Sequence, residues 1–377
     1  MKKLGDICDI QAGGTPLRSK KEFWDSGSIP WVKISDINSK FINKTEEFIT
    51  KAGLENSSAK IFHKGTILYT IFATVGEVAI LNCDAATNQA IAGIRITDGC
   101  VMQNYLYYSL IAIKDKVKTF SRGVAQNNIN LSMLRSLEIN IPTIEEQKLK
   151  TDCLDKITLL IEKKKQQLKN LDLLAKSRFI EMFGDVKNQK YVFLSRYAEF
   201  SSGYSFKTEC FQKDGVPIIR ISNINGDKVT VDNVVYYSNS FWDKNPSFRV
   251  NKYDILIAMS GATTGKTGMF LSDTHALLNQ RVAIIKPTLN CSTKEFLLVF
   301  TKMESFLEQI KLYSAGCAQP NISIKQLKNI KIPYASIEQQ HNFSLFIQQL
   351  DKSKFRIKKS LEKLEMTYKA LLQEYFG

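Results

Sequence analysis

The segment Ile29–Asn38 reads IPWVKISDIN, and the segment Val216–Asn225 reads VPIIRISNIN. Each begins with β-branched and aromatic residues that favour a strand, and each ends in a polar SDIN or SNIN turn. The two segments are separated by nearly half of the 377-residue chain. A match of this length at such a distance indicates an internal duplication.

Four further matches follow in the same order in both halves of the chain. They pair Lys64–Gly76 (KGTIL, then ATVG) with Lys252–Gly265 (KYDIL, then ATTG), Asn88 and Gln89 with Asn279 and Gln280, Gly123–Ile129 (GVAQNNI) with Gly316–Ile322 (GCAQPNI), and Ile144–Gln147 (IEEQ) with Ile337–Gln340 (IEQQ). The offset stays nearly constant, so the chain consists of two copies of one arrangement. Each copy is far longer than a solenoid repeat, and we expect it to be a domain with a further segment attached.

The first part of each copy has the composition of a mixed α/β domain. Short β-rich runs such as Thr66–Thr70 are cut by glycine, asparagine and aspartate, which is typical of strands joined by turns. Helical patterns lie near Asn104–Lys118 and, in the second copy, near Thr293–Lys311. The sequence therefore predicts one such domain at residues 1–142 and a second at residues 185–335.

A long helix is predicted after each domain, at residues 143–184 and 336–377. Neither proline nor glycine interrupts Glu145–Phe183 or Ile337–Phe376. Each stretch ends in Phe-Gly, and a glycine directly after the last helical residue is a common helix terminator.

Apolar residues recur in both helices at alternating spacings of three and four residues. The seam residues are Leu154, Ile157, Ile161, Leu168 and Leu171 in the first helix and Ile347, Leu350, Ile357, Leu361 and Leu364 in the second. This period predicts that each helix buries its seam against a partner helix, and the simplest partner is the other helix. The alternative is that each helix packs only on its own domain. The predicted fold is α+β: two tandem mixed α/β domains joined by two long helices that form an antiparallel coiled-coil spacer, with approximate two-fold symmetry.

The charge of the chain favours a polyanionic partner. Lysine and arginine number 52 against 37 acidic residues, which gives a formal net charge of +15. Nucleic acid and an anionic membrane surface both suit such an excess, and an inert basic surface is the remaining interpretation.

Cysteine and histidine usage argues against a metal site and for a reducing cytoplasm. The seven cysteines form no C-x-x-C pair, and only three histidines are present. Acidic residues follow Met1–Lys3 before any apolar run develops, so no signal peptide is expected. The most apolar stretch, Thr66–Leu81, is too short and too rich in β-formers to span a membrane.

Three segments are partly similar to catalytic motifs. Ser260–Thr267 is close to a phosphate-binding loop, but serine stands at its first glycine position, and the counterpart of Lys266 in the other copy is Glu77. Asn245–Phe248 lacks one proline of the adenine-methyltransferase motif, and Glu146 lies at a helix start rather than in a nuclease site. The three histidines are too far apart to suggest a catalytic triad. We therefore predict no catalytic residue and no cofactor.

Two similar basic domains on a helical spacer suit a DNA duplex with two half-sites. Phosphates are bound by lysine, arginine and hydroxyl groups, and base edges are read by arginine, asparagine and glutamine. The residues expected to contact DNA are Lys33, Ser35, Arg122, Gln126, Asn128, Arg220, Ser222, Lys266, Arg281, Gln319 and Asn321. Positions that are identical in both copies have the stronger claim to an architectural role, because two domains that read different sequences need different side chains. Residues that differ, such as Arg18, Lys20 and Lys21 against Lys207 and Lys213, are in principle better candidates for specificity.

Together these segments resemble the specificity subunit of type I restriction–modification systems, over essentially the whole chain. The resemblance rests on the duplicated GxAQxNI and IE(E/Q)Q segments, the opening Leu4–Ile7 and the strands that run into Lys33 and Arg220. It implies two target-recognition domains that each read one half of a bipartite double-stranded DNA target, with the helices as the spacer. It also implies a non-catalytic, cytoplasmic subunit whose partners are two methyltransferase subunits and restriction subunits.

Three alternatives remain open from the sequence. The first alternative, second to the type I interpretation, is the specificity subunit of a type IIB or another multisubunit restriction system. The second alternative is an enzyme, either an ATPase with a phosphate-binding loop or a methyltransferase that acts alone. Its turnover would depend on Lys266 or Asn245, respectively. A basic scaffold protein would bind RNA or a membrane surface without preferring one split DNA sequence.

Overall fold

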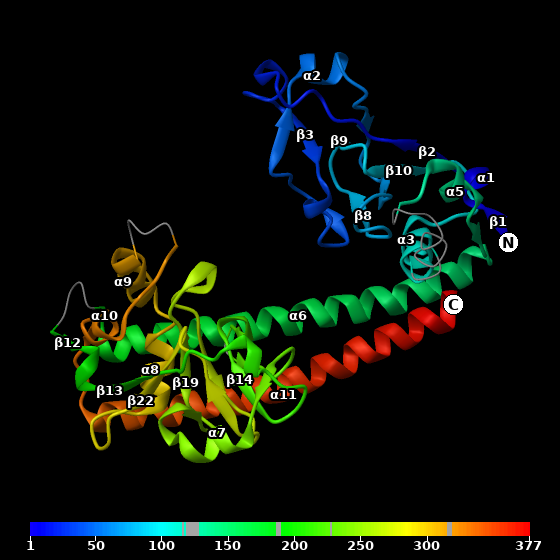
Figure 1. Ribbon diagram of the computed structural model, residues 1–377. Helices are drawn as coiled ribbons and strands as arrows, with labels where there is room; N and C mark the ends of the chain where they lie inside the picture. Colours follow the sequence, from blue (N-terminus) through cyan, green and yellow to red (C-terminus); the bar gives the residue numbers. More distant parts are fainter. Residues whose placement is uncertain (115–116, 118–127, 186–189, 227, 315–318) are drawn as a thin grey trace. The chain divides into compact units, whose positions relative to one another are not determined.

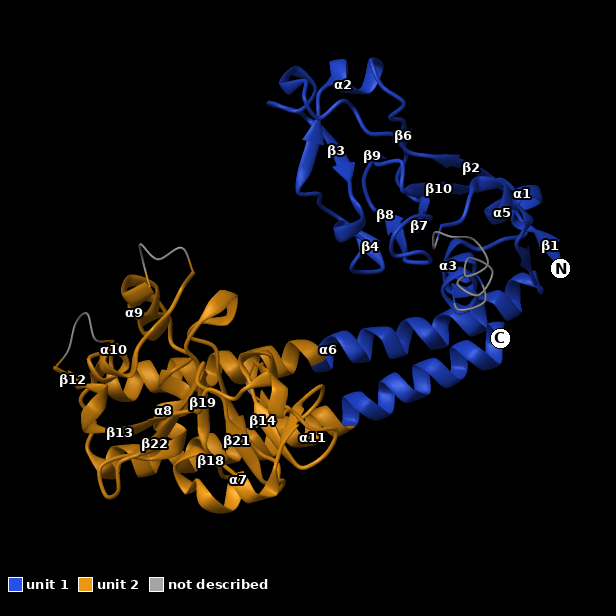
Figure 2. Ribbon diagram, viewed as in Figure 1, with its two compact units in different colours: residues 1–164, 360–377 blue, residues 165–359 orange. Residues whose placement is uncertain are grey.

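The computed structural model (Figure 1) describes residues 1–114, 117, 128–185, 190–226, 228–314 and 319–377. These residues form two compact units (Figure 2). Unit 1 comprises residues 1–164 and 360–377, and unit 2 comprises residues 165–359. Each long helix therefore contributes one part of its length to each unit.

Within its described residues, unit 1 contains short strands, four short helices and parts of the long helices. The strands are β1 (Lys2–Lys3), β2 (Cys8–Ala12), β3 (Ile29–Val32), β4 (Phe41–Ile42), β5 (Glu47–Ile49), β6 (Ile61–Phe62), β7 (Ile67–Thr70), β8 (Val78–Leu81), β9 (Ala85–Thr87), β10 (Ile91–Ile96) and β11 (Glu138–Ile139). The short helices are α1 (Leu4–Ile7), α2 (Lys51–Glu55), α3 (Gln103–Ala112) and α5 (Leu131–Ser136). Three sheets result, with strand orders β2-β10-β7-β8-β4, β5-β3-β9-β6 and β1-β11.

The described residues of unit 2 follow the same plan. Its strands are β12 (Tyr191–Phe193), β13 (Ala198–Ser202), β14 (Val216–Ile219), β15 (Ile224–Asn225), β16 (Lys228–Val229), β17 (Val235–Tyr237), β18 (Arg249–Val250), β19 (Ile255–Ala258), β20 (Thr267–Phe270), β21 (Ala276–Leu278), β22 (Val282–Pro287) and β23 (Lys331–Pro333). Its short helices are α7 (Asn239–Lys244), α8 (Lys294–Phe300), α9 (Glu304–Ser314) and α10 (Ile324–Lys328). The sheet orders are β13-β22-β19-β20-β16-β15, β17-β14-β21-β18 and β12-β23.

The duplication predicted from the sequence is confirmed strand by strand. Each sheet of unit 1 has a counterpart of the same order in unit 2, and β15 is an additional edge strand. Even the parallel pairs are repeated: β3 pairs with β9 in parallel and β14 with β21, with Trp31 opposite Ala86 and Ile218 opposite Leu277. Two copies of one sequence pattern have therefore folded into two copies of one topology.

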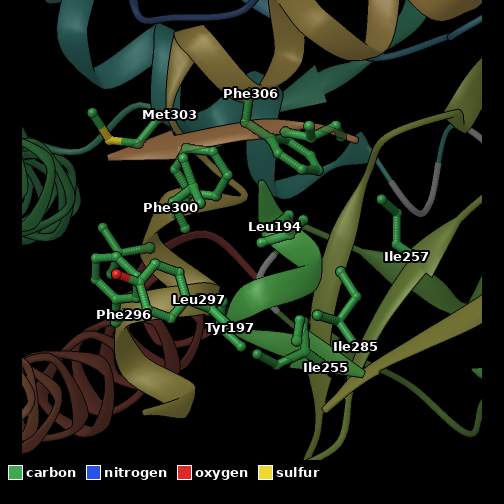
Figure 3. Packing of buried hydrophobic residues seen from close by; sticks show 14 of the residues in the cluster. Leu194, Tyr197, Ile255, Ile257, Ile285, Phe296, Leu297, Phe300, Met303 and Phe306 are labelled. Carbon is green, nitrogen blue, oxygen red and sulfur yellow. The ribbon is translucent and has the colours of Figure 1, made fainter. Parts of the chain in front are cut away.

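The main sheet of unit 2 is buried on both faces, which explains why β19 is a continuous apolar run. Successive strand residues point to opposite faces. Ile255 and Ile257 belong to a cluster that includes α8 and the long helices, whereas Leu256 and Ala258 pack with residues that include Ile219 from the four-stranded sheet. Figure 3 shows the first of these clusters.

Aromatic rings from four parts of unit 2 fill that cluster. Phe296 on α8 lies 5.5 Å from the ring of Tyr197, and the ring of Phe300 lies 5.4 Å from that of Phe306 on α9 (Figure 3). Phe179 contributes from the preceding long helix, 5.3 Å from Phe296. The α/β fold of unit 2 and the long helix therefore share one hydrophobic core, and they cannot separate without exposing large apolar surfaces.

The helix expected near Thr293–Lys311 is two helices, because the chain turns between α8 and α9. Thr301 is buried at the end of α8, and its hydroxyl group donates a hydrogen bond to the backbone carbonyl of Leu298. A second hydrogen bond, 2.9 Å long, joins the hydroxyl groups of Thr301 and Thr267. A threonine that bonds to the preceding turn and to a neighbouring strand favours an end to the helix.

The two long helices are α6 (Ile144–Phe183) and α11 (Ile337–Phe376), within one residue of the predicted bounds. At the start of α6, Thr143 and Glu146 each accept a hydrogen bond from the other's backbone N–H, both at 3.3 Å. Ser336 and Gln339 repeat this capping box at the start of α11. Gly184 has a φ of 75°, as a residue that ends a helix in the left-handed region should.

The last residue of the duplicated IE(E/Q)Q segment is fully buried in both copies. Gln147 accepts a hydrogen bond from the N–H of Met102 at 2.9 Å and donates to the carbonyls of Cys100 and Pro142. Gln340 does the same with Thr293, Cys291 and Ala335. One amide thus satisfies three backbone groups where each domain meets its helix, which gives the repeated glutamine an architectural role.

The long helices pair in antiparallel fashion in both units. In unit 1, Lys150 Nζ donates to the carbonyl of Tyr375. In unit 2, the ammonium of Lys354 lies 2.6 Å from the carboxylate of Asp172, which lets a lysine occupy the seam. Of the seam residues, Leu154, Ile347 and Leu350 are buried, and the other seven, Ile157, Ile161, Leu168, Leu171, Ile357, Leu361 and Leu364, are partly buried. None of the helices in the described parts of the chain has the length and apolar character needed to cross a bilayer.

Candidate nucleic-acid interface

The repeated segments of unit 2 meet where β14, β19 and β21 end. The N–H of Asn279, directly after β21, donates to the carbonyl of Ile219 at 3.1 Å. The N–H of Met259, directly after β19, donates to the carbonyl of Arg281 at 2.8 Å, and the N–H of Ile322 donates to the carbonyl of Met259 at 2.8 Å. Four segments far apart in the sequence are thus joined by backbone hydrogen bonds into one framework.

Unit 1 contains the same framework. The N–H of Asn88 donates to the carbonyl of Val32 at 3.1 Å, that of Ile71 to Ala90 at 2.8 Å, and that of Ile129 to Ile71 at 3.0 Å. The correspondence identifies Ala90 as the counterpart of Arg281.

Asparagine at the shared position of both copies orders this framework. The Oδ1 atom of Asn88 accepts from the N–H of Ala90 at 3.1 Å, and the Oδ1 atom of Asn279 accepts from the N–H of Arg281 at 3.2 Å. An asparagine that bonds to the backbone two residues ahead stabilises a turn. These identical residues therefore hold the backbone in both copies, as expected for positions that do not distinguish them.

Three of the residues expected to contact DNA surround one open cavity in unit 2. The cavity has a volume of about 520 Å³, and its lining includes Arg281, Gln319 and Asn321 together with Ser260 and Gln280. Arg281, Gln319 and Asn321 are all exposed. The segment around Asn321 is held in place because Asn321 forms a β-bridge with Ser260.

The loop that is similar to a phosphate-binding motif is a turn between two antiparallel strands. It joins β19 to β20, and the N–H of Gly265 donates to the carbonyl of Ala258 at 2.9 Å. Gly265 has a φ of 84°, and Gly76 in the other copy has a φ of 91°. Glycine is required here for the turn, since L-residues rarely adopt this conformation.

Lys266 lies at a different place from the other expected contacts. Its exposed side chain lines a second cavity of unit 2, of about 410 Å³, together with Lys176, Lys302 and the ion pair of Lys354 with Asp172. This concentration of ammonium groups suits a phosphate better than a base edge.

Lys33 and Arg220 occupy equivalent positions but have different surroundings. The ammonium of Lys33 lies 2.6 Å from a carboxylate oxygen of Glu46 and 3.3 Å from one of Glu47, and the hydrogen bond to Glu46 raises the pKa of Lys33. Arg220 instead donates from Nη2 to the carbonyl of Asn233 at 3.3 Å. Arg220 therefore keeps its positive charge available among the described residues, whereas the charge of Lys33 is compensated.

The remaining expected contacts are distributed as follows. Ser35 and Ser222 are exposed in the short 3-10 turns Ile34–Asp36 and Ile221–Asn223 that follow β3 and β14. Asn128 is half-buried directly before Ile129. Arg122 and Gln126 lie outside the described residues.

Of the charged residues that differ between the copies, Arg18 is already engaged. It pairs with Glu47, and its guanidinium lies 3.7 Å from the ring centroid of Trp24 and 4.8 Å from that of Trp31. Lys20 lies 3.7 Å from Glu22. Lys21, Lys207 and Lys213 are exposed.

Two structural features were missed by sequence reasoning. Ser260 lines the cavity, and only its alignment with Phe72 in the other copy would have marked it as a differing position. Asp155 on α6 binds Lys40 at 2.5 Å and accepts from Asn104 and Tyr108, so it joins the domain of unit 1 to its helix. No pattern in the sequence indicates this, because the partners come from distant segments. In the described parts of the chain, no group of three or more His, Cys, Asp or Glu side chains has the arrangement of a metal site.

A family profile and individual relatives both match this chain to type I restriction–modification specificity subunits. A family profile described as the type I restriction modification DNA specificity domain matches residues 1–171 and 187–366. The MjaIX type I restriction enzyme specificity subunit of Methanocaldococcus jannaschii is 35% identical over 201 residues, covering 51% of this chain and 46% of that protein. The EcoprrI specificity subunit of Escherichia coli is 20% identical over 376 residues, covering 92% of this chain and 86% of that protein. The first of these matches spans less than half of that relative's length.

Two solved structures have the same fold. The S subunit of a type I restriction–modification system from M. genitalium has a TM-score of 0.54 at 18% identity, with 100% of this chain and 95% of that chain covered. A chain from a structure of complex assembly and conformational transition in the type I system has a TM-score of 0.59 at 17% identity, with 99% and 96% covered.

Proposed function

The chain belongs to the family of type I restriction–modification DNA specificity domains, and on that premise we propose that it is the DNA-recognition subunit of such a complex. Residues 1–142 and 185–335 are the two target-recognition domains. Each contacts one half of a bipartite double-stranded target, and the helices at residues 143–184 and 336–377 form the spacer.

The observation that carries this proposal is the repeated backbone framework with different exposed side chains. Shared residues such as Asn88 and Asn279 bond to the backbone in both copies, whereas Ala90 stands where the other copy has Arg281. A protein that reads two different half-sites with one fold needs this combination. The net charge of +15 supports binding to the phosphate backbone.

Phosphate and base contacts are divided among the expected residues. Arg220, Lys266 and the hydroxyls of Ser35 and Ser222 suit phosphates, because each is exposed or retains a free donor on a loop after a strand. Arg281, Gln319, Asn321 and their counterparts Gln126 and Asn128 suit base edges. Lys33 and Arg122 remain proposed contacts with the backbone of the duplex.

We further propose that the subunit is not catalytic and acts in the cytoplasm through two methyltransferase subunits and restriction subunits. Large apolar residues on the long helices point away from the seam. They include Leu149, Leu159, Leu173, Phe355 and Met366, whose exposed fractions range from 49% to 74%. Binding of the methyltransferase and restriction subunits along the helices would cover these apolar side chains.

The test is the methylation pattern of genomic DNA. Cells that carry this chain with its cognate methyltransferase subunit are compared with cells that carry the methyltransferase alone. We expect a new methylated motif of two short blocks separated by a fixed unspecified gap. An unchanged pattern, with both proteins present, would refute the proposal.

Exchange of one domain tests the two-domain arrangement. Replacing residues 1–142 by the corresponding domain of a homologue should change one block of the motif and leave the other block intact. A change in both blocks would contradict the assignment of one domain to each half-site.

A further inference from the structure

The equivalence of the two frameworks identifies the side chains that distinguish them. Because Met259 and Ile71 make the same two backbone hydrogen bonds, the residues next in sequence, Ser260 and Phe72, are counterparts. Arg281 and Ala90 are counterparts for the same reason. The backbone hydrogen bonds beside these two positions are the same in both copies, whereas the side chains differ.

The backbone of Arg281 is fixed on both sides, and its side chain is not. Its N–H donates to Asn279, and its carbonyl accepts from Met259. The guanidinium forms no hydrogen bond or ion pair with any residue that the structure describes, and the residue is exposed. An arginine with a fixed backbone and unused guanidinium donors can bind an external acceptor.

The surroundings of Arg281 contain no acidic partner for its guanidinium among the described residues. Among the described residues, the lining of its cavity contains no carboxylate, and amides come from Gln280, Gln319 and Asn321. The hydroxyl oxygen of Ser260 is buried and lacks a hydrogen-bond partner in the described parts of the chain. Buried polar atoms are normally paired, so an unpaired one at this place indicates a ligand atom or water that completes it.

In unit 1, the counterparts of Ser260 and Arg281 are apolar. Phe72 is 37% exposed, and the side chain of Ala90 is a methyl group without a hydrogen-bond donor. The amide oxygen of Gln89 already accepts a hydrogen bond from Thr15. At these two positions unit 1 therefore offers van der Waals contact where unit 2 offers hydrogen bonds.

We propose that Arg281, with Ser260 beside it, is a specificity-determining residue that reads a guanine in the half-site bound by unit 2. Arginine binds the O6 and N7 acceptors of guanine in the major groove through two donors, a geometry that the other bases do not provide. Phe72 and Ala90 make an apolar contact at the matching place in the other half-site, as a thymine methyl group permits. The inference rests on the proposed function and adds the residue pair that separates the two half-sites.

The experiment compares methylated motifs in cells that carry the cognate methyltransferase with wild-type chain, with Arg281→Ala or with Arg281→Gln. Arg281→Ala should relax a single guanine position in one block, with the preference for guanine there falling roughly 10- to 100-fold. Arg281→Gln should move the preference at that position towards adenine, because glutamine pairs with the N6 and N7 atoms of adenine. The other block should be unchanged in both variants.

A matched control removes the same charge elsewhere in unit 2. Arg196 is exposed and does not line the cavity, so Arg196→Ala should leave the motif unchanged. The inference is overturned if the motif of Arg281→Ala equals that of the wild type, or if both blocks change. It is also overturned if both Arg281 variants lose all methylation while their urea unfolding curves match the wild type, since Arg281 would then supply affinity without base preference.

The outcome separates this inference from the function on which it depends. If the wild-type chain produces no bipartite motif, the proposed function fails. If it does and Arg281→Ala leaves the motif intact, only the assignment of Arg281 fails.

Discussion

Replacing the buried Gln147 by leucine should lower the free energy of unfolding of unit 1 by about 3 kcal/mol. The amide of Gln147 bonds to the N–H of Met102 and to the carbonyls of Cys100 and Pro142. Losing the acceptor of the N–H costs about 2 kcal/mol, and each carbonyl costs roughly 0.5 kcal/mol, because Cys100 and Pro142 are partly accessible to water. Leucine has nearly the volume of glutamine, so no cavity contributes.

The assay is urea unfolding followed by tryptophan fluorescence in a Trp242→Phe background. Trp24 and Trp31 both belong to unit 1, and Trp242 is the tryptophan of unit 2, so this background reports on unit 1 alone. A loss of about 3 kcal/mol should lower the urea midpoint by about 1–2 M.

The matched control is Gln167→Leu, which makes the same substitution at an exposed position of α6. It should change the free energy of unfolding by less than about 0.5 kcal/mol. If Gln147→Leu costs less than about 1 kcal/mol, water replaces the amide at all three backbone groups, and the architectural role of the repeated glutamine is wrong.

Three further substitutions test the packing of single residues, each by urea unfolding. Asp155→Ala should destabilise unit 1 by about 2–3 kcal/mol, because it removes the carboxylate that pairs with Lys40, a side chain that is only 11% exposed. Adding Lys40→Met to Asp155→Ala should recover part of this loss, because the unpaired ammonium is then removed. Burial raises the pKa of Asp254, so the folded state binds a proton more tightly than the unfolded chain, and stability rises as pH falls through that pKa. Asp254→Asn should therefore stabilise unit 2 at neutral pH, with the gain vanishing below the ordinary pKa of aspartate; a gain that persists at low pH would exclude the ionised carboxylate as its cause. Gly265→Ala should lower the free energy of unfolding of unit 2 by about 2 kcal/mol, because φ at Gly265 is 84° and a Cβ atom there would lie 2.9 Å from the side chain of Ile310. The control Gly99→Ala should leave that free energy nearly unchanged in unit 1, because a Cβ atom at Gly99 would have no neighbour within 4 Å.

The sequence predicted the architecture well because the duplication supplied an internal comparison. Matching segments had to occupy matching places, and the period of the seam residues fixed which helix face is turned inward. The helix bounds followed from local signals, namely the Ile-Glu start and the Phe-Gly end of α6 and α11.

The charge state of the candidate contacts was not predictable, because it depends on residues brought close by the fold. Lys33 and Arg220 occupy equivalent places after equivalent strands, yet only Lys33 meets carboxylates, from Glu46 and Glu47 beside β5. The break between α8 and α9 was missed for a similar reason. Thr301 ends α8 through a bond to Thr267 on a strand that lies more than thirty residues earlier in the chain.

The contacts between each domain and its helix differ between the copies, and this sets a condition for exchanging domains. In unit 1, Asn104 donates to Asp155 on α6 at 2.9 Å. In unit 2, the equivalent contact has the amide on the helix and the carboxylate on the domain, since Gln348 on α11 donates to the carboxylate of Glu295 at 3.3 Å. Each helix therefore matches only its own domain.

A chain with residues 185–335 in place of residues 1–142 would bring a second copy of Glu295 against Asp155. Two carboxylates at about 4 Å repel by roughly 1–4 kcal/mol, depending on exposure to solvent. The chimera that also carries Asp155→Gln should restore the contact of unit 2 and should unfold at higher urea than the chimera that retains Asp155. Equal midpoints would show that the junction tolerates the repulsion. If the stable chimera methylates DNA with the cognate methyltransferase, its motif should consist of two copies of the same block in inverted orientation, as the proposed antiparallel spacer predicts.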